Sequence, residues 1–184
     1  MKANEVRLQP MKDINYRLMT LLYKFASPFC NAKQHLEHIP VKKGMVVVDY
    51  GCGPGRYTLN LSKIVGQKGR VIALDIHPKA IETIKVKAAR KFLTNIEPLL
   101  IESYNTGIQD SSVDLVLLID TLPLIKDLDS LLREIHRMLK EDGCLFVSHG
   151  RISVVETRTI MEKSGLFTIQ ECRGHDILAT LRSN

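Results

Sequence analysis

Tryptophan, paired cysteines and long apolar runs are all missing from this sequence of 184 residues. The longest apolar stretches, Met45–Val48 and Leu115–Ile119, are far shorter than the roughly 20 residues that a membrane-spanning helix needs. The four cysteines form no CxxC pair, which argues against a zinc site and against a disulfide framework. The first residues, Met1–Glu5, carry no apolar core or cleavage site of a secretory signal. We therefore expect a cytoplasmic protein without a metal site.

The composition is that of a globular protein. Hydrophobic residues make up 45% of the chain and charged residues 25%, which are average values and exclude a disordered or fibrous protein. A chain of this length commonly forms one domain, and no repeat or linker-like segment divides it. We predict a single domain that spans residues 1–184.

The net charge of +6 is unevenly distributed. Residues 1–44 carry eight basic and three acidic side chains, and Lys79–Lys91 carries five basic and one acidic. Such patches can bind phosphate groups or nucleic acid. Helical charge runs are more often solvated faces, and the chain has no tryptophan to stack on bases. Nucleic acid therefore remains a secondary expectation for the binding partner.

Short apolar runs alternate with helical patterns along the chain. The runs are rich in β-branched residues, and their continuous apolar character indicates strands of a parallel sheet that is covered on both faces. Five such strands are predicted, at Met45–Tyr50, Arg70–Asp75, Ile96–Ile101, Val113–Ile119 and Cys144–Ser148. The helical patterns between them are Tyr57–Val65, Lys79–Phe92, Leu128–Leu139 and Val154–Ser164. Gly143, just past the third pattern, is expected in the turn that ends that helix.

The last part of the chain differs from this alternation. Leu166–Cys172 and His175–Leu181 are strand-like and are joined by Arg173 and Gly174, a pattern typical of an antiparallel hairpin. The whole pattern predicts an α/β fold: a Rossmann-like, doubly wound, mostly parallel seven-stranded sheet with a C-terminal antiparallel hairpin, in a three-layer α/β/α sandwich.

Residues 1–38 precede the first strand, and the part from residue 13 onward is helical in pattern, with Pro28 dividing it in two. An apolar stripe runs along this part. It consists of Leu18, Leu21, Leu22 and Phe25. The stripe fits permanent docking on the core, and it equally fits a helical lid over a ligand site, since both need an apolar face. Tyr16 and Arg17 could close over a substrate, but surface placement is the expectation for both.

One motif points to a ligand. Asp49-Tyr50-Gly51-Cys52-Gly53-Pro54-Gly55 follows the first strand directly and precedes a helix. Glycines let the backbone turn sharply and approach a ligand, because no Cβ intrudes. Twenty residues beyond Gly55, Asp75 ends the second strand, where a carboxylate can accept both hydroxyls of an adenosine ribose.

The glycine spacing distinguishes between two cofactors that contain such a ribose. The dinucleotide fingerprint GxGxxG would need glycine at position 56, which is Arg56. Asp49 would also repel a pyrophosphate, whereas it suits a ligand with an ammonium group. S-adenosylmethionine carries an ammonium and a sulfonium and no phosphate, so it fits the motif better than a nicotinamide dinucleotide does.

These motifs give the chain a resemblance to class I S-adenosylmethionine-dependent methyltransferases over roughly residues 40–182. Val46–Gly55 resembles the family's first motif, and Val71–Pro78 resembles its second strand with the ribose acid. Ser112–Val116 resembles its fourth strand, and Glu134–Lys140 resembles the helix before its fifth. The family usually continues Leu-Lys-Pro-Gly-Gly, whereas this chain has Leu-Lys-Glu-Asp-Gly at 139–143, which changes a turn.

The resemblance implies a shell of residues around S-adenosyl-L-methionine. They are Asp49, Gly51, Cys52, Gly53, Gly55, Asp75, Ile76, His77, Glu102, Ser103 and Ile119. By this resemblance, the glycine loop passes beside the methionine part, and Asp49 contacts the ammonium group through water. Asp75 holds the ribose, and Ile76 packs on the adenine. Glu102 and the Ser103 amide bond the adenine edge, although the family usually has Asp-Ala there.

The catalytic residues are less defined. Asp120 ends the fourth strand beside Ile119, where the resemblance places the methyl group, and His149 follows the fifth strand and could act as a general base. The Asn/Asp-Pro-Pro-Tyr/Phe motif of amino-group methyltransferases is replaced by Asp120-Thr121-Leu122-Pro123. That change disfavours DNA adenine as the acceptor.

The chain has little beyond this cofactor core, so we expect methyl transfer to a small molecule that the N-terminal helices cover. Two alternatives stay open: an RNA or protein acceptor on the basic N-terminal face, and a non-catalytic S-adenosylmethionine-binding subunit that activates a partner.

Overall fold

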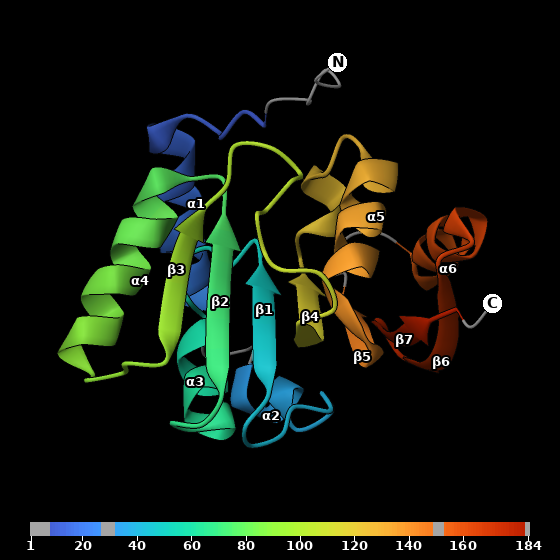
Figure 1. The fold of residues 1–184 in the computed structure, drawn as a ribbon. Coiled ribbons are helices and arrows are strands. Elements are labelled where there is room, and N and C mark those ends of the chain that lie inside the picture. Colours follow the sequence, from blue (N-terminus) through green and yellow to red (C-terminus); the bar gives the residue numbers. More distant parts are fainter. Residues whose placement is uncertain (1–7, 27–31, 149–152, 183–184) are drawn as a thin grey trace, which may run out of the picture.

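The computed structural model describes residues 8–26, 32–148 and 153–182. It is a seven-stranded sheet between two layers of helices, and this three-layer architecture confirms the predicted fold class (Figure 1). The strands are β1 (Val46–Tyr50), β2 (Arg70–Asp75), β3 (Ile96–Leu100), β4 (Val113–Ile119), β5 (Leu139–Ser148), β6 (Phe167–Arg173) and β7 (Asp176–Leu181). The helices are α1 (Asp13–Ala26), α2 (Ala32–Leu36), α3 (Thr58–Val65), α4 (Pro78–Arg90), α5 (Leu128–Met138) and α6 (Val154–Ser164), with a short 3-10 turn, η2, at Leu122–Leu124.

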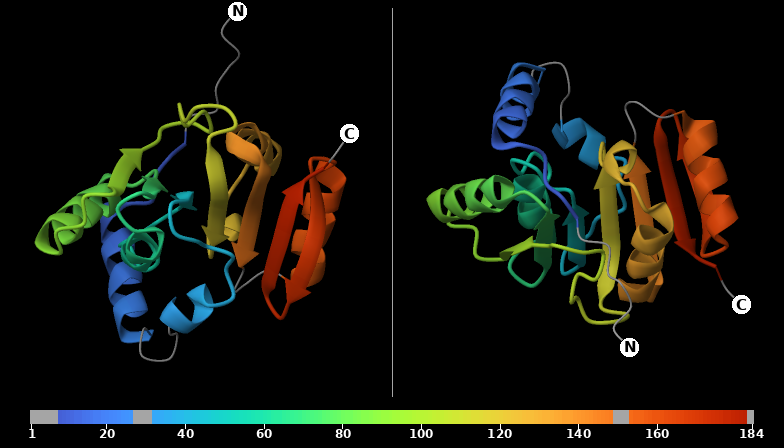
Figure 2. Two further views of the ribbon diagram at one scale, coloured as in Figure 1. Left: turned by 60° about the horizontal axis from the view of Figure 1, so that its bottom comes forward. Right: turned by 90° about the horizontal axis from the view of Figure 1, so that it is seen from above.

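The strand order is β3-β2-β1-β4-β5-β7-β6. β1 pairs in parallel with both β2 and β4, and β7 pairs antiparallel with both β5 and β6. The order reverses between β1 and β4, and in such sheets ligands bind beyond the carboxyl ends of the strands at this reversal. β6, β7 and α6 form the edge of the molecule opposite to α4 (Figure 2).

Successive side chains of the central strands pack on opposite faces of the sheet. Val47 and Leu115 pack toward α2 and α3, whereas Val48 and Val116 pack toward α5 and α6. All four side chains are completely buried. This double burial is why the central strands read as continuous apolar runs.

Two local expectations differ from the structure. β3 has no buried residue, because it is the edge strand and has a neighbour on one side only. β5 begins at Leu139, directly after α5, and passes through an irregular pairing with β4. Gly143 is therefore part of a strand and not of a helix-ending turn. A Cβ on Gly143 would come within 2.9 Å of the Val113 and Lys140 carbonyl oxygens, which explains glycine there.

α1 does not dock through the leucines of its predicted stripe. Leu18 is 57% exposed and Leu21 is 50% exposed, whereas Tyr16, expected at the surface, is 5% exposed. The side chains of Arg17, Leu22 and Phe25 lie outside the described part. Among the helices that the structure describes, none is both long enough and apolar enough to cross a membrane.

Candidate functional site

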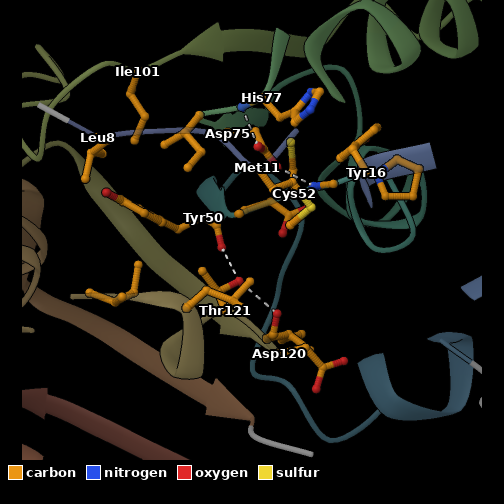
Figure 3. Close-up of a pocket in the computed structure, with 18 of the residues that line it drawn as sticks. Leu8, Met11, Tyr16, Tyr50, Cys52, Asp75, His77, Ile101, Asp120 and Thr121 are labelled. Carbon is orange, nitrogen blue, oxygen red and sulfur yellow. Dashed lines mark hydrogen bonds between the residues drawn. The ribbon is translucent and has the colours of Figure 1, made fainter. Parts of the chain in front are cut away.

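A cavity of about 360 Å³ opens at the carboxyl ends of β1, β2 and β4, where the strand order reverses. Figure 3 shows Asp75 and His77 at one end of the cavity and Asp120 and Thr121 at the other. Its walls combine acidic side chains, among them the buried Asp49 and the partly buried Asp75, with mostly apolar ones. The apolar ones include Leu8, Met11, Ile76, Ile101, Ile119, Leu124 and Ile125.

The loop after β1 is held in a conformation that needs glycine. Gly51 has φ +76°, and its amide and that of Cys52 both donate to the Leu74 carbonyl, at 2.8 and 2.9 Å. A Cβ on Gly51 would come within 2.7 Å of Thr121 Cγ2. The Thr121 hydroxyl in turn donates to the carbonyls of Tyr50 and Ile119, which ties the ends of β1 and β4 together (Figure 3).

Asp75 faces the cavity from the end of β2. One of its carboxylate oxygens accepts the Gly53 amide and the other accepts the His77 amide, both at 2.8 Å. Burial raises the pKa of this carboxyl, and the two amide hydrogen bonds oppose that rise. Each carboxylate oxygen keeps a second lone pair, so Asp75 can still accept hydrogen bonds from a ligand.

Asp49 is 4% exposed and is the next-to-last residue of β1, just before the glycine loop. The Thr58 hydroxyl donates to one of its carboxylate oxygens at 2.5 Å. Burial raises the pKa of Asp49 to about 6, the Thr58 hydrogen bond opposes the rise, and the charge of Asp75 adds to it. A cationic group bound beside these two acids would relieve the cost of both charges.

The raised pKa of Asp49 leads to a stability prediction. The folded protein binds this proton near pH 6 and the unfolded chain near pH 3.8, so the group favours the folded state below pH 3.8 and loses that contribution as pH rises to about 6. Asp49→Asn should therefore raise the free energy of unfolding of the ligand-free protein at pH 7.5, by up to about 3 kcal/mol. The gain should disappear below about pH 4.

Urea unfolding at several pH values measures this effect. Asp114→Asn is the matched control, because Asp114 accepts the Val46 amide at 2.7 Å and pairs with Lys140 at 2.6 Å. That control should destabilise the protein at pH 7.5. If the free energies of unfolding of Asp49→Asn and of the unaltered protein were the same at every pH, Asp49 would not be a buried carboxylate that is charged at pH 7.5.

Most of the predicted binding residues lie around this one cavity. Those that line it are Asp49, Gly51, Cys52, Gly53, Asp75, Ile76, His77 and Ile119, together with the catalytic candidate Asp120. Asp120 has φ +55°, so the chain turns sharply after β4 and brings this residue to the cavity wall. The Cys52 thiol is buried, which raises its pKa well above the usual range and keeps it neutral.

Three predicted residues are not part of the cavity lining. Gly55 faces α4, where a Cβ would come within 2.7 Å of Ile84 Cδ1. Glu102 is exposed, and Ser103 bonds locally to the Asn105 carbonyl at 3.4 Å. The cavity wall there is made by the residues on either side, Ile101 and Tyr104. The adenine contacts of Glu102 and Ser103 stay predictions, and His149 lies outside the described residues.

Sequence reasoning missed several residues of the site because no local pattern marks them. Tyr16 comes from α1 and stacks on His77, with ring centroids 4.0 Å apart and 20° between the planes. Neither its hydroxyl nor His77 Nε2, both buried, has a hydrogen-bond partner among the described residues, although Nε2 lies 3.6 Å from an Asp13 carboxylate oxygen. Burial raises the pKa of Tyr16 to about 12, and the charge of Asp75 adds to this rise. Arg56 and Tyr57, directly after the glycine loop, also line the cavity.

No group of three or more histidine, cysteine, aspartate or glutamate side chains that could hold a metal ion occurs in the part of the chain that the structure describes. The residues that line the cavity supply acidic side chains and apolar walls. A glycine loop at the strand reversal, with an acid at the end of each of two neighbouring strands, defines a nucleoside-cofactor-binding α/β domain.

Comparison with known proteins gives the family. The model of a family described as "Methyltransferase domain" matches residues 41–183, and the chain belongs to this family. The match confirms the resemblance to class I S-adenosylmethionine-dependent methyltransferases that the motifs suggested. It also covers the strands and the glycine loop that form the cavity.

Three similar proteins illustrate the match. A demethylmenaquinone methyltransferase of Staphylococcus epidermidis is 35% identical over 111 residues, which are 60% of this chain and 45% of that protein. An (S)-coclaurine N-methyltransferase of Thalictrum flavum is 30% identical over 115 residues, 62% of this chain and 31% of that protein. The chain thus spans less than half the length of either relative. The structure of a SAM-dependent methyltransferase from Aquifex aeolicus superposes with a TM-score of 0.83 at 22% identity, over 94% of this chain and 100% of that one.

Proposed function

We propose that this protein transfers a methyl group from S-adenosylmethionine to a small-molecule acceptor. The observation that carries the proposal is the pair of acids, the buried Asp49 and the partly buried Asp75, that line one largely apolar cavity beside the glycine loop. Two carboxylates would repel a pyrophosphate, whereas they suit an ammonium group and a ribose. The sulfonium of the bound cofactor would supply an activated methyl group, so the protein has mainly to position the acceptor and exclude water.

Different residues of the cavity lining would hold different parts of the cofactor. Asp75 would accept the ribose hydroxyls, and Ile76 would pack against the adenine. Asp49, whose charge interacts with that of Asp75, would attract the ammonium group, and the Arg56 guanidinium offers a partner for the methionine carboxylate. All of these groups are already held by the fold before a ligand binds, which reduces the entropy lost on binding.

The apolar walls favour a small organic acceptor. Leu8, Met11 and Leu124 line the mouth of the cavity, and Leu124 is 64% exposed. The names of the relatives above also point to small organic substrates. An acceptor with an aromatic or other apolar body would bury surface against these side chains.

Calorimetry with S-adenosylmethionine, S-adenosylhomocysteine and NAD tests the cofactor, and methyl transfer to a panel of small phenols, quinols and amines tests the acceptor. We expect binding of the first two ligands and not of NAD, with transfer to at least one class of small acceptor. Binding without transfer to any small molecule, but with transfer to RNA or protein, would contradict the proposed acceptor. Binding with no transfer at all would favour an activator subunit, and binding of NAD alone would overturn the cofactor.

The lid function of residues 1–38 over the acceptor remains a proposal, and Tyr16 tests a separate point, whether α1 also contributes to the cofactor site. Tyr16→Ala removes the ring that stacks on His77, so cofactor binding should weaken by about fivefold to tenfold, the equivalent of one aromatic contact. Leu18→Ala, on the exposed side of the same helix, is the control and should change nothing. Calorimetry with S-adenosylhomocysteine measures both, and equal affinities would remove α1 from the cofactor site.

A further inference from the structure

Three side chains from separate elements form a hydrogen-bonded chain at one wall of the cavity. The Tyr57 hydroxyl, just before α3, lies 3.0 Å from Nδ1 of His35 on α2. His35 Nε2 lies 3.2 and 3.1 Å from the two carboxylate oxygens of Asp176, the first residue of β7. The His35 ring also meets the ring of Phe146 edge-on, with centroids 5.8 Å apart. Two hydrogen bonds and this ring contact therefore fix the orientation of the imidazole.

The direction of the hydrogen bonds follows from the carboxylate. An ionised Asp176 can only accept, so His35 Nε2 carries the proton that it donates to Asp176. Nδ1 of the neutral imidazole is then an acceptor, and the Tyr57 hydroxyl donates to it. In this order the imidazole can take a proton from the hydroxyl, and the carboxylate stabilises the imidazolium that results.

Tyr57 belongs to the end of the cavity where methyl transfer would occur. It lines the cavity, and its neighbour Thr58 donates to Asp49, the acid proposed for the ammonium of the cofactor. Asp75, the acid proposed for the ribose, lies with His77 at one end of the cavity (Figure 3). The chain of three residues thus reaches the methionine end of the cofactor site.

We propose that Tyr57 is a catalytic residue that removes the proton from a hydroxyl group of the acceptor, and that His35 and Asp176 are positioning residues that enable it to do so. The inference rests on the proposed methyl transfer and narrows the acceptor to compounds with an ionisable hydroxyl, such as phenols and quinols. The acceptor proton passes to the Tyr57 oxygen while the Tyr57 proton passes to His35 Nδ1. The acceptor forms its bond to the methyl carbon as the sulfur–methyl bond breaks, and the electron pair of that bond stays on sulfur.

This relay needs a neutral His35, because an imidazolium has no lone pair for the Tyr57 proton. The titratable groups that contact His35 are Tyr57 from the start of α3 and Asp176 from β7, and Phe146 from β5 adds an uncharged ring. The Arg56 guanidinium lies 5.4 Å from the Tyr57 ring centroid. Transfer to a neutral hydroxyl therefore depends on the free lone pair of His35 Nδ1.

The test compares Tyr57→Phe and His35→Gln with the unaltered full chain. The acceptors are a series of phenols, some neutral and some already ionised at the assay pH, and a naphthoquinol. For neutral phenols and the quinol, kcat of either variant should fall by about 100-fold or more, the usual effect of removing a general base. For phenols that are already ionised the deficit should shrink to about threefold or less, because no proton has to be removed.

His38→Gln is the matched control, since His38 is an exposed histidine three residues beyond His35 and should leave every rate unchanged. Tyr57→Phe should leave the thermal unfolding temperature and the affinity for S-adenosylhomocysteine nearly unchanged, because phenylalanine preserves the ring packing of Tyr57. A deficit that is equal for neutral and ionised phenols would show that the three residues only fasten α2 to the sheet. That result, or unchanged kcat, overturns the relay.

A second measurement separates this inference from the proposed function. Nitrogen NMR of His35 in the complex with S-adenosylhomocysteine should show a proton on Nε2 and none on Nδ1, and Tyr57→Phe should shift the Nδ1 resonance. A proton on Nδ1 at neutral pH would overturn the relay whichever acceptor is used. If no phenol or quinol is methylated by the unaltered protein, the proposed acceptor class fails and the relay fails with it, whereas calorimetry still decides the cofactor.

Discussion

Asp75→Ala is expected to weaken S-adenosylmethionine binding by tenfold or more. The carboxylate can make two hydrogen bonds to a ribose, and hydrogen bonds to a charged group contribute about 1.5–3 kcal/mol each. Water can replace part of that contribution in the variant, and about 1.4 kcal/mol already corresponds to tenfold in the dissociation constant. The change also removes the acceptor of the Gly53 and His77 amides, so the glycine loop loses its anchor. Both effects reduce affinity.

Calorimetry with S-adenosylhomocysteine, combined with thermal unfolding of the ligand-free protein, measures the effect. Asp129→Ala is the control, since Asp129 is exposed on α5 and pairs only along its own helix with Arg133. We expect a loss of affinity in Asp75→Ala that is much larger than its loss of stability. An unchanged dissociation constant in a folded variant would remove Asp75 from the site.

Gly51→Ala should be the most damaging small substitution in the glycine loop. A residue other than glycine at φ +76° costs about 1–2 kcal/mol in strain. The added Cβ would also meet the Thr121 side chain, and overpacking of this kind typically costs about 1–3 kcal/mol. We therefore expect a destabilisation of about 3 kcal/mol. Cofactor binding should be lost as well, because displacing Thr121 separates the ends of β1 and β4.

Gly44→Ala is a close control for this prediction. Gly44 has φ +85°, but a Cβ there has no atom within 4 Å. Gly44→Ala should therefore lose stability only through backbone strain, and its affinity for S-adenosylhomocysteine should be unchanged. Denaturant unfolding of both variants gives the two costs, and equal destabilisation would contradict the steric role assigned to Thr121.

The core of the fold could be predicted from the sequence because its signals are local. Asp75 ends a strand in the predicted position, β4 and α6 begin and end where their apolar patterns do, and Gly51 has the left-handed backbone that a tight turn needs. The expectations for β3 and β5 were less accurate. Burial of a strand depends on whether it lies at the sheet edge, and a strand that starts directly after a helix has no turn residues to mark its beginning.

The sequence by itself determined the class of the protein and pointed to most of the predicted residues that line the cavity, since strand, glycine loop, helix and terminal acid follow one another within about thirty residues. The tertiary structure alone decided which distant side chains complete the site. Tyr16 reaches His77 only because α1 packs against the start of α4, and His35 meets both Tyr57 and Asp176 only because α2 lies beside β7. Contacts between residues 22 and 141 positions apart leave no periodic trace in a sequence, because each depends on how whole elements pack.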